Sequence, residues 1–531
     1  MLLHHFLEES ARKYPEKIAV VERGKRFSYR DIEQSANRLA YVLRQHGVER
    51  GERVAVFLDN SVEAVISLFA ILKADAVFLL LSPLLKAGKL SYCLRDCGVK
   101  AFISDAKKIN LFGQVLDSIP GLNPVIVTGK VDEVRKRGVK SFIGWDEIES
   151  IRTYPGAPNK NIDIDLASII YTSGSTANPK GVMLTHLNMI SAATSIVTYL
   201  ENSSEDIIMN VLPLSFDYGL YQILMAFKFG GTVVLEKSFA YPYEIIKTMV
   251  REKVTGFPGV PTIFAVLLQM DLRHCNLDCL RYITNTAAAL PVEYIRKLRS
   301  VFPNAKIYSM YGLTECKRVS YLPPEELEKR PDSVGRAMPN EEVWIVNEKG
   351  ERAGPGVIGE LVVRGSNVMK GYWNDPDATD AVLKPGKLPG EKILYTGDLF
   401  KMDNEGFLYF VGRKDDMIKT RGERVGPEEV ESALYSLAGV AEAAVVPVPD
   451  DILGNAIKAC IVLKKGHALT VREVIAHCRR ILEEYAVPKY VEFRESFPKN
   501  TSGKIDRLSL KLDAANFKQD QLGGALSGEG P

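Results

Sequence analysis

A segment rich in hydroxyls and glycines, YTSGSTANPKG at residues 171–181, concentrates the groups that bind phosphate. It follows an apolar run, LASII, and precedes a helix that Thr185 is placed to cap. Small residues let backbone N–H groups turn toward an anion, hydroxyls donate hydrogen bonds to its oxygens, and Lys180 adds positive charge. The spacing is not that of a Walker loop, because Pro179 and Gly181 stand where that motif has its second glycine and its Ser or Thr. We interpret the segment as a phosphate clamp of another kind.

Four further segments place charged residues beside glycines or hydroxyls. They are YGLTE at 311–315, YTGD at 395–398, the charged run GRKDDMIKTRGER at 412–424, and PKNTSGK at 498–504. Taken singly, a Thr-Glu pair after a strand caps a helix, Asp398 after a glycine is a turn residue, and Lys504 is a surface lysine. Their joint occurrence in this order favours one shared function.

With Gly359–Leu361 and Gly371–Tyr372 added, these segments resemble the motifs of the adenylate-forming (AMP-binding) enzyme superfamily. The chain is most similar to AMP-forming acyl-CoA synthetases, and around Phe216 and Asp217 it is similar to amino-acid adenylation domains. The resemblance covers nearly the whole chain. It implies ATP-dependent activation of a carboxylic acid to an acyl adenylate with release of pyrophosphate, followed by transfer of the acyl group to a thiol.

The resemblance also implies where the cosubstrate ATP and the cofactor Mg²⁺ bind. The loop from Thr172 to Lys180 would hold the β- and γ-phosphates, Thr314 the α-phosphate, and Glu315 the magnesium ion, a hard cation that prefers carboxylate oxygen. Asp398, assisted by Arg413, would accept hydrogen bonds from the ribose hydroxyls. The residues implied for ATP or AMP binding are Thr172, Ser173, Gly174, Ser175, Thr176, Lys180, Ala287, Tyr311, Gly312, Thr314, Asp398, Arg413 and Lys504.

Catalysis in the first half-reaction would depend on Lys504, which would reach the carboxylate and the α-phosphate. The catalytic residues implied are Lys504, Thr314, Glu315 and Arg424. Asp415 matches the family's hinge, and Arg424 belongs to a loop that would enter the site after the small domain rotates.

Substrate choice depends on a different set of residues. The predicted pocket residues are Phe216, Asp217, Tyr221, Asn285 and Met310. Many acyl-CoA and aryl-CoA synthetases have an aromatic-His pair where this chain has Phe216 and Asp217. In amino-acid-activating relatives an Asp at this place pairs with the substrate's ammonium group; alternatively, Asp217 caps the following helix or faces solvent.

The thiol acceptor is predicted to be coenzyme A, which makes the chain an acyl-CoA synthetase and suggests a fatty acid as substrate. The alternative is an amino acid or acyl ligase that loads the phosphopantetheine of an acyl or peptidyl carrier protein. A nucleotide sensor without catalysis is disfavoured, because Lys504, Glu315 and Asp398 are all present.

The elements that must position these residues form an α/β pattern. Ser28 and Asp31 form a predicted capping box for a helix that ends before Gly47. Short apolar strands are predicted at 53–58, 100–103, 124–128, 206–212, 231–235, 282–284 and 306–309. After Gly335, strands at 342–346, 359–364 and 407–411 alternate with turns and predict a β-rich subdomain.

Beyond the charged run we predict a small, mobile α+β domain. A helix at 428–437, strands at 441–448 and 456–463, and a helix at 471–485 follow one another. The predicted domains are a large layered AMP-binding domain at 1–411, a hinge at 412–416, a C-terminal domain at 417–517 and a disordered tail at 518–531.

Composition excludes several other classes of protein. The chain has 531 residues, too many for one hydrophobic core, and 46% of them are hydrophobic. Its net charge of +2 disfavours a nucleic-acid partner. Seven cysteines, an odd number, are expected to be free thiols, and with no signal peptide they predict a cytoplasmic location. The apolar stretch 65–81 includes Lys73 and Asp75, so we predict a core helix and a buried strand there rather than a membrane span.

Overall fold

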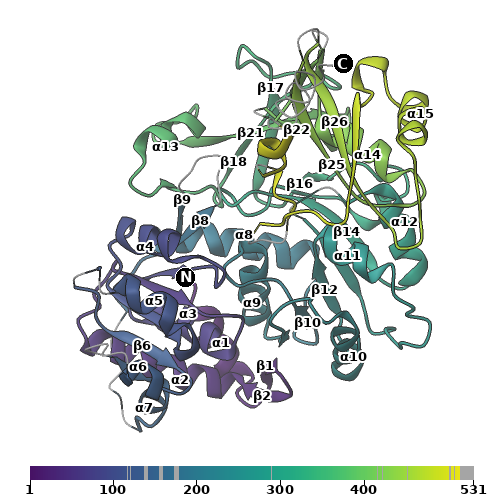
Figure 1. Ribbon diagram of the computed structural model, residues 1–531. Coiled ribbons are helices and arrows are strands. Elements are labelled where there is room, and N and C mark those ends of the chain that lie inside the picture. The colour runs from purple at the N-terminus through teal and green to yellow at the C-terminus, as the bar shows by residue number, and fades with distance from the viewer. Residues whose placement is uncertain are drawn as a thin grey trace, which may run out of the picture.

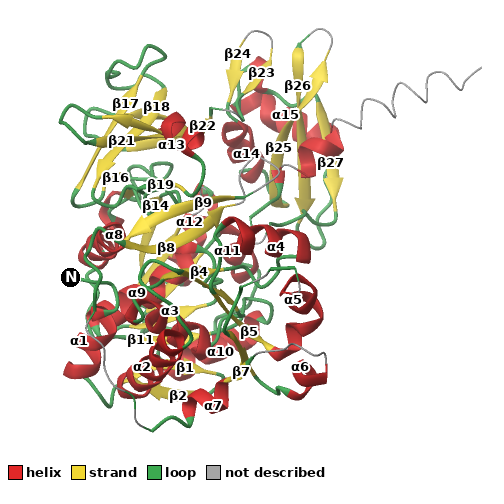
Figure 2. Cartoon of the chain, turned by 90° about the vertical axis from the view of Figure 1, so that its left-hand side faces the viewer, coloured by secondary structure: helices red, strands yellow, loops and turns green. Residues whose placement is uncertain are grey.

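The computed structural model describes residues 1–531 except 117, 120, 137–141, 153, 155–158, 173–178, 287, 289, 415, 421–422, 451–452, 501–503, 508 and 515–531. The described part has the predicted α/β architecture: layered sheets and helices form the N-terminal bulk, and a smaller unit lies at the C-terminal end (Figures 1 and 2). Within this part of the chain, no helix is both long and apolar enough to cross a membrane.

The first sheet has eight strands in the order β19-β9-β8-β4-β3-β5-β6-β7. The strands from β8 to β7 are parallel, whereas β9 and β19 are antiparallel to their neighbours. The strands are β3 (Arg53–Phe57), β4 (Val77–Leu80), β5 (Ala101–Asp105), β6 (Val125–Thr128), β7 (Ile143–Gly144), β8 (Leu166–Thr172), β9 (Lys180–Thr185) and β19 (Gly371–Tyr372). The predictions of strands near 53, 100 and 124 are confirmed.

The second sheet has nine strands in the order β16-β15-β14-β13-β12-β10-β11-β1-β2. Its central strands are parallel, so the carboxyl ends of β10, β13 and β14 meet at one edge. The strands are β1 (Ile18–Glu22), β2 (Lys25–Ser28), β10 (Ile207–Asn210), β11 (Thr232–Leu235), β12 (Gly256–Gly259), β13 (Tyr282–Asn285), β14 (Lys306–Tyr311), β15 (Ser320–Tyr321) and β16 (Arg336–Ala337).

Successive side chains of a strand point to opposite faces of the sheet, and in the large part of the molecule they contribute to two separate hydrophobic cores. In β3, Val54 and Val56 join the core shared with the second sheet, whereas Ala55 and Phe57 face a smaller core under α4 and α5. The capping box of Ser28 and Asp31 begins α2 as predicted. The helices of this part are α1 (His5–Lys13), α2 (Tyr29–Gln45), α3 (Val62–Lys73), α4 (Ala87–Asp96), α5 (Ile109–Leu116), α6 (Asp132–Lys136), α7 (Trp145–Glu149), α8 (His186–Tyr199), α9 (Asp217–Phe229), α10 (Pro242–Glu252), α11 (Pro261–Leu267) and α12 (Val292–Val301).

The β-rich subdomain is a five-stranded antiparallel sheet. Its main path is β17-β18-β21-β20, and β22 pairs with β21. The elements are β17 (Glu341–Val346), β18 (Gly359–Gly365), α13 (Pro376–Val382), β20 (Leu383–Pro385), β21 (Lys392–Met402) and β22 (Leu408–Arg413). The predicted strands at 342, 359 and 407 are confirmed, with β22 starting and ending slightly later than expected.

The C-terminal unit has its own sheets and its own small cores. Its elements are β23 (Ile418–Thr420), β24 (Glu423–Val425), α14 (Pro427–Tyr435), β25 (Val440–Asp450), β26 (Gly454–Leu463), α15 (Val471–Ile481) and β27 (Tyr490–Arg494). The helix predicted at 471–485 is shorter than expected: α15 ends at Ile481 and a short 3-10 turn, Glu484–Ala486, follows. The last strand of the large part ends at Arg413 and the first of this unit begins at Ile418. The predicted hinge at 412–416 therefore begins inside β22, which includes Gly412 and Arg413, and its Asp415 lies outside the described residues.

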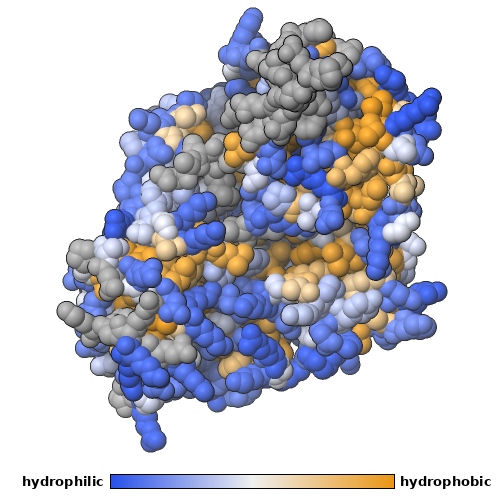
Figure 3. Space-filling model, in the orientation of Figure 1, coloured by the Kyte–Doolittle hydropathy of each residue, from blue (hydrophilic) through white to orange (hydrophobic). Residues whose placement is uncertain are grey.

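The surface matches the composition. The face seen in Figure 3 is mostly hydrophilic, with hydrophobic residues gathered in a band across its middle. All seven cysteines are free thiols, as predicted, and Cys93 and Cys97 are buried.

Candidate active site

The predicted phosphate loop connects the two strands of a hairpin. Thr172 ends β8 opposite Lys180, which begins β9, and the Thr172 Oγ1 donates a hydrogen bond to the Lys180 carbonyl oxygen at 3.4 Å. The helix that Thr185 caps does follow, but β9 comes before it, which the sequence did not predict. Ser173, Gly174, Ser175 and Thr176 lie outside the described residues.

Lys180 and Glu315 both contact Tyr372, Lys180 at the face of its ring and Glu315 at its hydroxyl. The Lys180 Nζ lies 5.2 Å from the centroid of the Tyr372 ring, and the Tyr372 hydroxyl donates to Glu315 Oε1 at 2.7 Å. The backbone N–H of Met369 donates to the Glu315 carbonyl at 2.7 Å, which fixes the turn after β14. Burial and the Glu315 charge raise the pKa of Tyr372. The carboxylate is therefore held in place beside the loop, and its oxygens suit a divalent cation.

Asp398 lies inside β21 and is buried, so it is not the turn residue that its glycine neighbour suggested. The Tyr311 hydroxyl donates to its Oδ2 at 2.5 Å, and the Arg413 Nε lies 3.2 Å from its Oδ1. Pairing of β21 with β22 places Asp398 directly opposite Arg413. Burial raises the pKa of Asp398, although the charge of Arg413 acts to lower it.

One oxygen of this carboxylate remains able to accept. Oδ1 is buried and has no hydrogen-bond partner among the described residues, because its contact with Arg413 lacks hydrogen-bond geometry. A buried acceptor without a donor is costly, so a ligand hydroxyl would satisfy it.

Lys504 enters the same region from the C-terminal unit. Two hydrogen bonds join it to Asn500: the Asn500 side chain accepts from the Lys504 N–H at 3.0 Å, and the Asn500 N–H donates to the Lys504 carbonyl at 2.8 Å. The Lys504 Nζ lies 5.8 Å from the centroid of the Phe216 ring. Burial lowers the pKa of Lys504, while the nearby carboxylates of Asp217 and Asp398 act to raise it.

Asp217 is the first residue of α9, and its carboxylate already has a cationic partner. Lys317 Nζ lies 3.5 Å from Asp217 Oδ2, and both side chains are almost entirely buried. The ammonium also lies 4.6 Å from the centroid of the Tyr221 ring. Burial lowers the pKa of Lys317 to about 7, although Asp217 acts to raise it. Asp217 therefore neither faces solvent nor caps the helix, whose N-cap is Phe216.

Two glycines allow the backbone to pack this closely. A Cβ on Gly219, in the first turn of α9, would lie 2.3 Å from the Pro213 carbonyl oxygen. A Cβ on Gly312 would lie 2.3 Å from the Lys317 carbonyl oxygen. The loop before α9 and the turn after β14 can therefore contain no larger residue at these positions.

The remaining pocket residues surround the same strand ends. Asn285, at the end of β13, donates through Nδ2 to the Ala288 carbonyl at 3.0 Å, and its Oδ1 is buried without a hydrogen-bond partner among the described residues. The Met310 Sδ accepts from the Tyr199 hydroxyl at 3.1 Å. Thr314 is half-buried in the turn after β14, so the pair Thr314 and Glu315 caps no helix.

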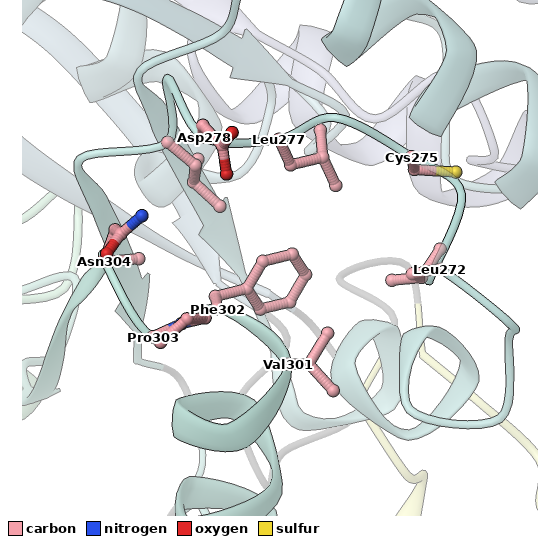
Figure 4. Close-up of a pocket in the computed structure, with 10 residues that line it drawn as sticks. Leu272, Cys275, Leu277, Asp278, Val301, Phe302, Pro303 and Asn304 are labelled. Carbon is pink, nitrogen blue, oxygen red and sulfur yellow. The ribbon is translucent and has the colours of Figure 1, made fainter.

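Some predicted site residues are not placed. Ala287 and Asp415 lie outside the described residues, as does the side chain of Arg424 in β24. A separate pocket, drawn in Figure 4, is lined by residues that include Leu272, Phe302 and Asn304. None of its lining residues belongs to the predicted site.

Three residues near the site were not predicted to take part in it: Tyr372, Lys317 and Arg318. Tyr372 belongs to the motif segment Gly371–Tyr372, but the sequence assigned no function to it. Lys317 and Arg318 directly follow YGLTEC as two basic residues, a pattern typical of a solvated surface, and nothing in the local sequence marks them as buried.

Comparison with known proteins gives two family matches along the chain. A family described as AMP-binding enzyme matches residues 7–373, and one described as AMP-binding enzyme C-terminal domain matches residues 429–504. A long-chain-fatty-acid–CoA ligase of Bacillus subtilis is 34% identical, covering 96% of this chain and 94% of its own length. Gramicidin S synthase 2 of Aneurinibacillus migulanus is 29% identical over 96% of this chain, which is 11% of that much longer protein.

Two solved structures have a fold similar to that of this chain over nearly its whole length. The anthranilate CoA ligase AuaEII in complex with anthranoyl-AMP has a TM-score of 0.89 at 27% identity, covering 99% of this chain and 98% of that one. ATP-bound MatB from Rhodopseudomonas palustris has a TM-score of 0.85 at 27% identity, covering 97% and 100%.

Proposed function

The chain belongs to the AMP-binding enzyme family, and on that premise we propose that it activates a carboxylic acid with ATP and passes the acyl group to coenzyme A. The observation that carries the proposal is the position of Lys504. This lysine comes from the C-terminal unit, yet it lies beside Phe216 and within electrostatic range of Asp217 and Asp398. A cation held there suits a reaction that brings a carboxylate to a phosphate.

In the first half-reaction the acid's carboxylate oxygen attacks the α-phosphorus of ATP, the bond to the β-phosphate bridging oxygen breaks, and pyrophosphate leaves. We assign Lys504 and Thr314 to the α-phosphate and the attacking carboxylate, where they stabilise charge that is shared in the transition state. Lys180 and the loop from Thr172 would hold the β- and γ-phosphates. Glu315 would hold Mg²⁺, which supplies charge neutralisation when bound.

The nucleoside would be held at Asp398. Its Oδ1 accepts no hydrogen bond from the described residues and so suits a ribose hydroxyl as donor, while Tyr311 and Arg413 orient the carboxylate. Ala287 and Gly312 would lie against the adenosine. Asn285, Met310, Phe216 and Tyr221 would border the acyl group.

In the second half-reaction the thiol sulfur attacks the acyl carbon, the thioester forms and AMP leaves. We propose that the C-terminal unit rotates about Asp415 and brings Arg424 into the site for this step. The large domain would then comprise 1–411 and the mobile domain 417–517.

The acid is proposed to carry no ammonium group. Asp217 would have to pair with that group, but Lys317 already neutralises it. The relatives named long-chain-fatty-acid–CoA ligases support an aliphatic acid, and coenzyme A as the thiol. The similarity to gramicidin S synthase 2 keeps an amino acid loaded onto a carrier protein as the alternative. The free thiols support a cytoplasmic location.

The test is pyrophosphate release with ATP and Mg²⁺ across aliphatic, aryl and amino acids, each with and without coenzyme A. We expect release with aliphatic acids that becomes sustained only when coenzyme A is added. Lys504→Ala should lower the adenylation rate on the order of 100-fold and change the KM for ATP far less, because the lysine acts on the transition state.

Lys499→Ala is the matched control, since Lys499 belongs to the same segment but pairs with Glu442 at 2.8 Å on the surface. Release confined to amino acids and indifferent to coenzyme A would replace the proposal by the carrier-protein alternative. An unchanged adenylation rate in Lys504→Ala would remove the role of that lysine.

A further inference from the structure

Tyr372 contacts two charged side chains that come from distant parts of the chain. It is 8% exposed, and it lies where the hairpin of β8 and β9 meets the turn after β14. The Lys180 ammonium lies over the face of its ring, and its hydroxyl donates to Glu315 Oε1. The two contacts use different atoms of the side chain, so Tyr372 can hold both charged groups at the same time.

The backbone around Tyr372 joins the same two parts of the site through residues 369–373. On one side β19 pairs with β9, and the Trp373 N–H donates to the Gly181 carbonyl at 2.7 Å. On the other side the Met369 N–H donates to the Glu315 carbonyl at 2.7 Å. This short segment therefore fixes the strand that leaves the phosphate loop relative to the turn that presents Glu315.

The start of α13 holds the Tyr372 backbone in this place. The Tyr372 N–H donates to Thr379 Oγ1 at 2.9 Å, and the Thr379 hydroxyl donates to the Asp375 carbonyl at 2.8 Å. Gly371 has a φ of 145°, where a side chain would be strained, and a Cβ there would lie 2.7 Å from Thr379 Cγ2. The position of Tyr372 is therefore set by contacts within the protein and needs no ligand.

A fixed hydroxyl gives the Glu315 carboxylate one orientation. Carboxylates that bind a metal ion generally accept a further hydrogen bond, which holds them in the geometry that the ion needs and raises its affinity. The Tyr372 hydroxyl uses Oε1, so the other oxygen of Glu315 can face a cation. Without the hydroxyl, the carboxylate would rotate about its terminal bond, because such torsions are broad.

The ring face gives the Lys180 side chain a preferred position. An ammonium group is attracted to the electron-rich face of an aromatic ring, and it keeps its N–H groups for other partners. A free lysine side chain has many rotamers, and selecting one of them costs entropy when a ligand binds. The contact with Tyr372 lowers that cost for a phosphate that binds beside Glu315.

We propose that Tyr372 is a positioning residue of the ATP site, whose hydroxyl holds Glu315 for Mg²⁺ and whose ring holds Lys180 for the β- and γ-phosphates. The inference rests on the proposed function and gives a role to a residue outside its catalytic set. The two roles are separable. Loss of the hydroxyl affects the metal alone, whereas loss of the ring also affects the nucleotide.

The experiment measures ATP binding at equilibrium, by calorimetry without an acid substrate, once with EDTA and once with saturating Mg²⁺. For Tyr372→Phe we expect the dissociation constant with EDTA to stay within roughly twofold of the parent, and the constant with Mg²⁺ to rise on the order of 10-fold. For Tyr372→Leu the constant with EDTA should rise as well, roughly threefold, because the contact with Lys180 is lost. A general folding defect would weaken binding equally in both conditions.

Tyr409 provides the matched control, because it makes the same two kinds of contact outside the predicted site. Lys401 Nζ lies 5.5 Å from the centroid of its ring, and its hydroxyl donates to Asp403 Oδ2 at 3.2 Å. Tyr409→Phe and Tyr409→Leu should leave both dissociation constants unchanged. Glu315→Gln removes the proposed metal ligand itself, so adding Tyr372→Phe to it should weaken binding no further.

The outcomes separate the two proposals. A Tyr372→Phe variant in which Mg²⁺ tightens ATP binding as much as in the parent would overturn the role of Tyr372 and leave acid activation standing. A parent protein that binds ATP in neither condition would overturn both. A thermal melt of each variant shows whether a loss of binding reflects unfolding.

Discussion

The pairing of Asp217 with Lys317 decides how this pocket differs from one that binds an amino acid. The family resemblance left Asp217 open between pairing with a substrate ammonium group, capping the helix and facing solvent, and the structure gives it a cationic partner from the chain itself. Because both side chains are buried, each charge depends on the other.

We expect Asp217→Asn to lower the free energy of unfolding by about 3 kcal/mol, because it leaves the Lys317 ammonium buried without its counter-charge. Urea denaturation at pH 6, where Lys317 is protonated, measures this. The double variant Asp217→Asn with Lys317→Met removes both charges and should regain most of the stability. Plain carboxylic acids should still react with the double variant. A single variant as stable as the parent would show that the pair contributes nothing.

At the scale of elements, α14 shows how burial makes a charged cluster sensitive to pH. Arg507 lies 2.6 Å from Glu431 Oε2 and 3.5 Å from Glu428 Oε1, so two carboxylates share one guanidinium. Glu428 Oε2 is buried and has no hydrogen-bond partner in the described part of the chain. Burial, together with the charge of Glu431, raises the pKa of Glu428 to about 7.

We expect α14 to lose local stability as the pH rises from about 4.5 to about 7. Over that range the folded state keeps the proton on Glu428 and the unfolded state does not, so the free energy of unfolding falls with pH. Hydrogen exchange of the α14 amides, corrected for intrinsic rates, measures the change. Glu428→Gln should weaken this dependence on pH without abolishing it, because burial also raises the pKa of Glu431 in the same helix. Protection that increases with pH would contradict the assignment.

At the scale of the whole molecule, the C-terminal unit rests on the large one. The Tyr294 hydroxyl of α12 donates to the Ala441 carbonyl at 2.7 Å, and the Tyr294 ring packs edge-on against Tyr435. These contacts accompany the placement of Lys504 beside Phe216, which suits the first half-reaction. The rotation that we propose for the second half-reaction would break these contacts.

We expect Asp415→Pro to block that change, because proline fixes φ at the hinge. Single-turnover measurement of pyrophosphate release should stay within roughly twofold of the parent, while thioester formation falls at least on the order of 100-fold. The two half-reactions serve as internal controls for each other. Equal loss of both would indicate a general folding defect instead of a hinge.

Sequence alone determined the fold class and most strands, because alternation and turn residues are local signals that tertiary packing did not override here. It also singled out Asp398 and Lys504, which the structure brings within electrostatic range of each other, since the family motifs preserve their order. Only the tertiary structure decided what Asp217 contacts and that Lys317 and Arg318 are buried, because burial depends on which distant strand ends and helices converge. A local pattern of two basic residues after a turn contains no information about that convergence.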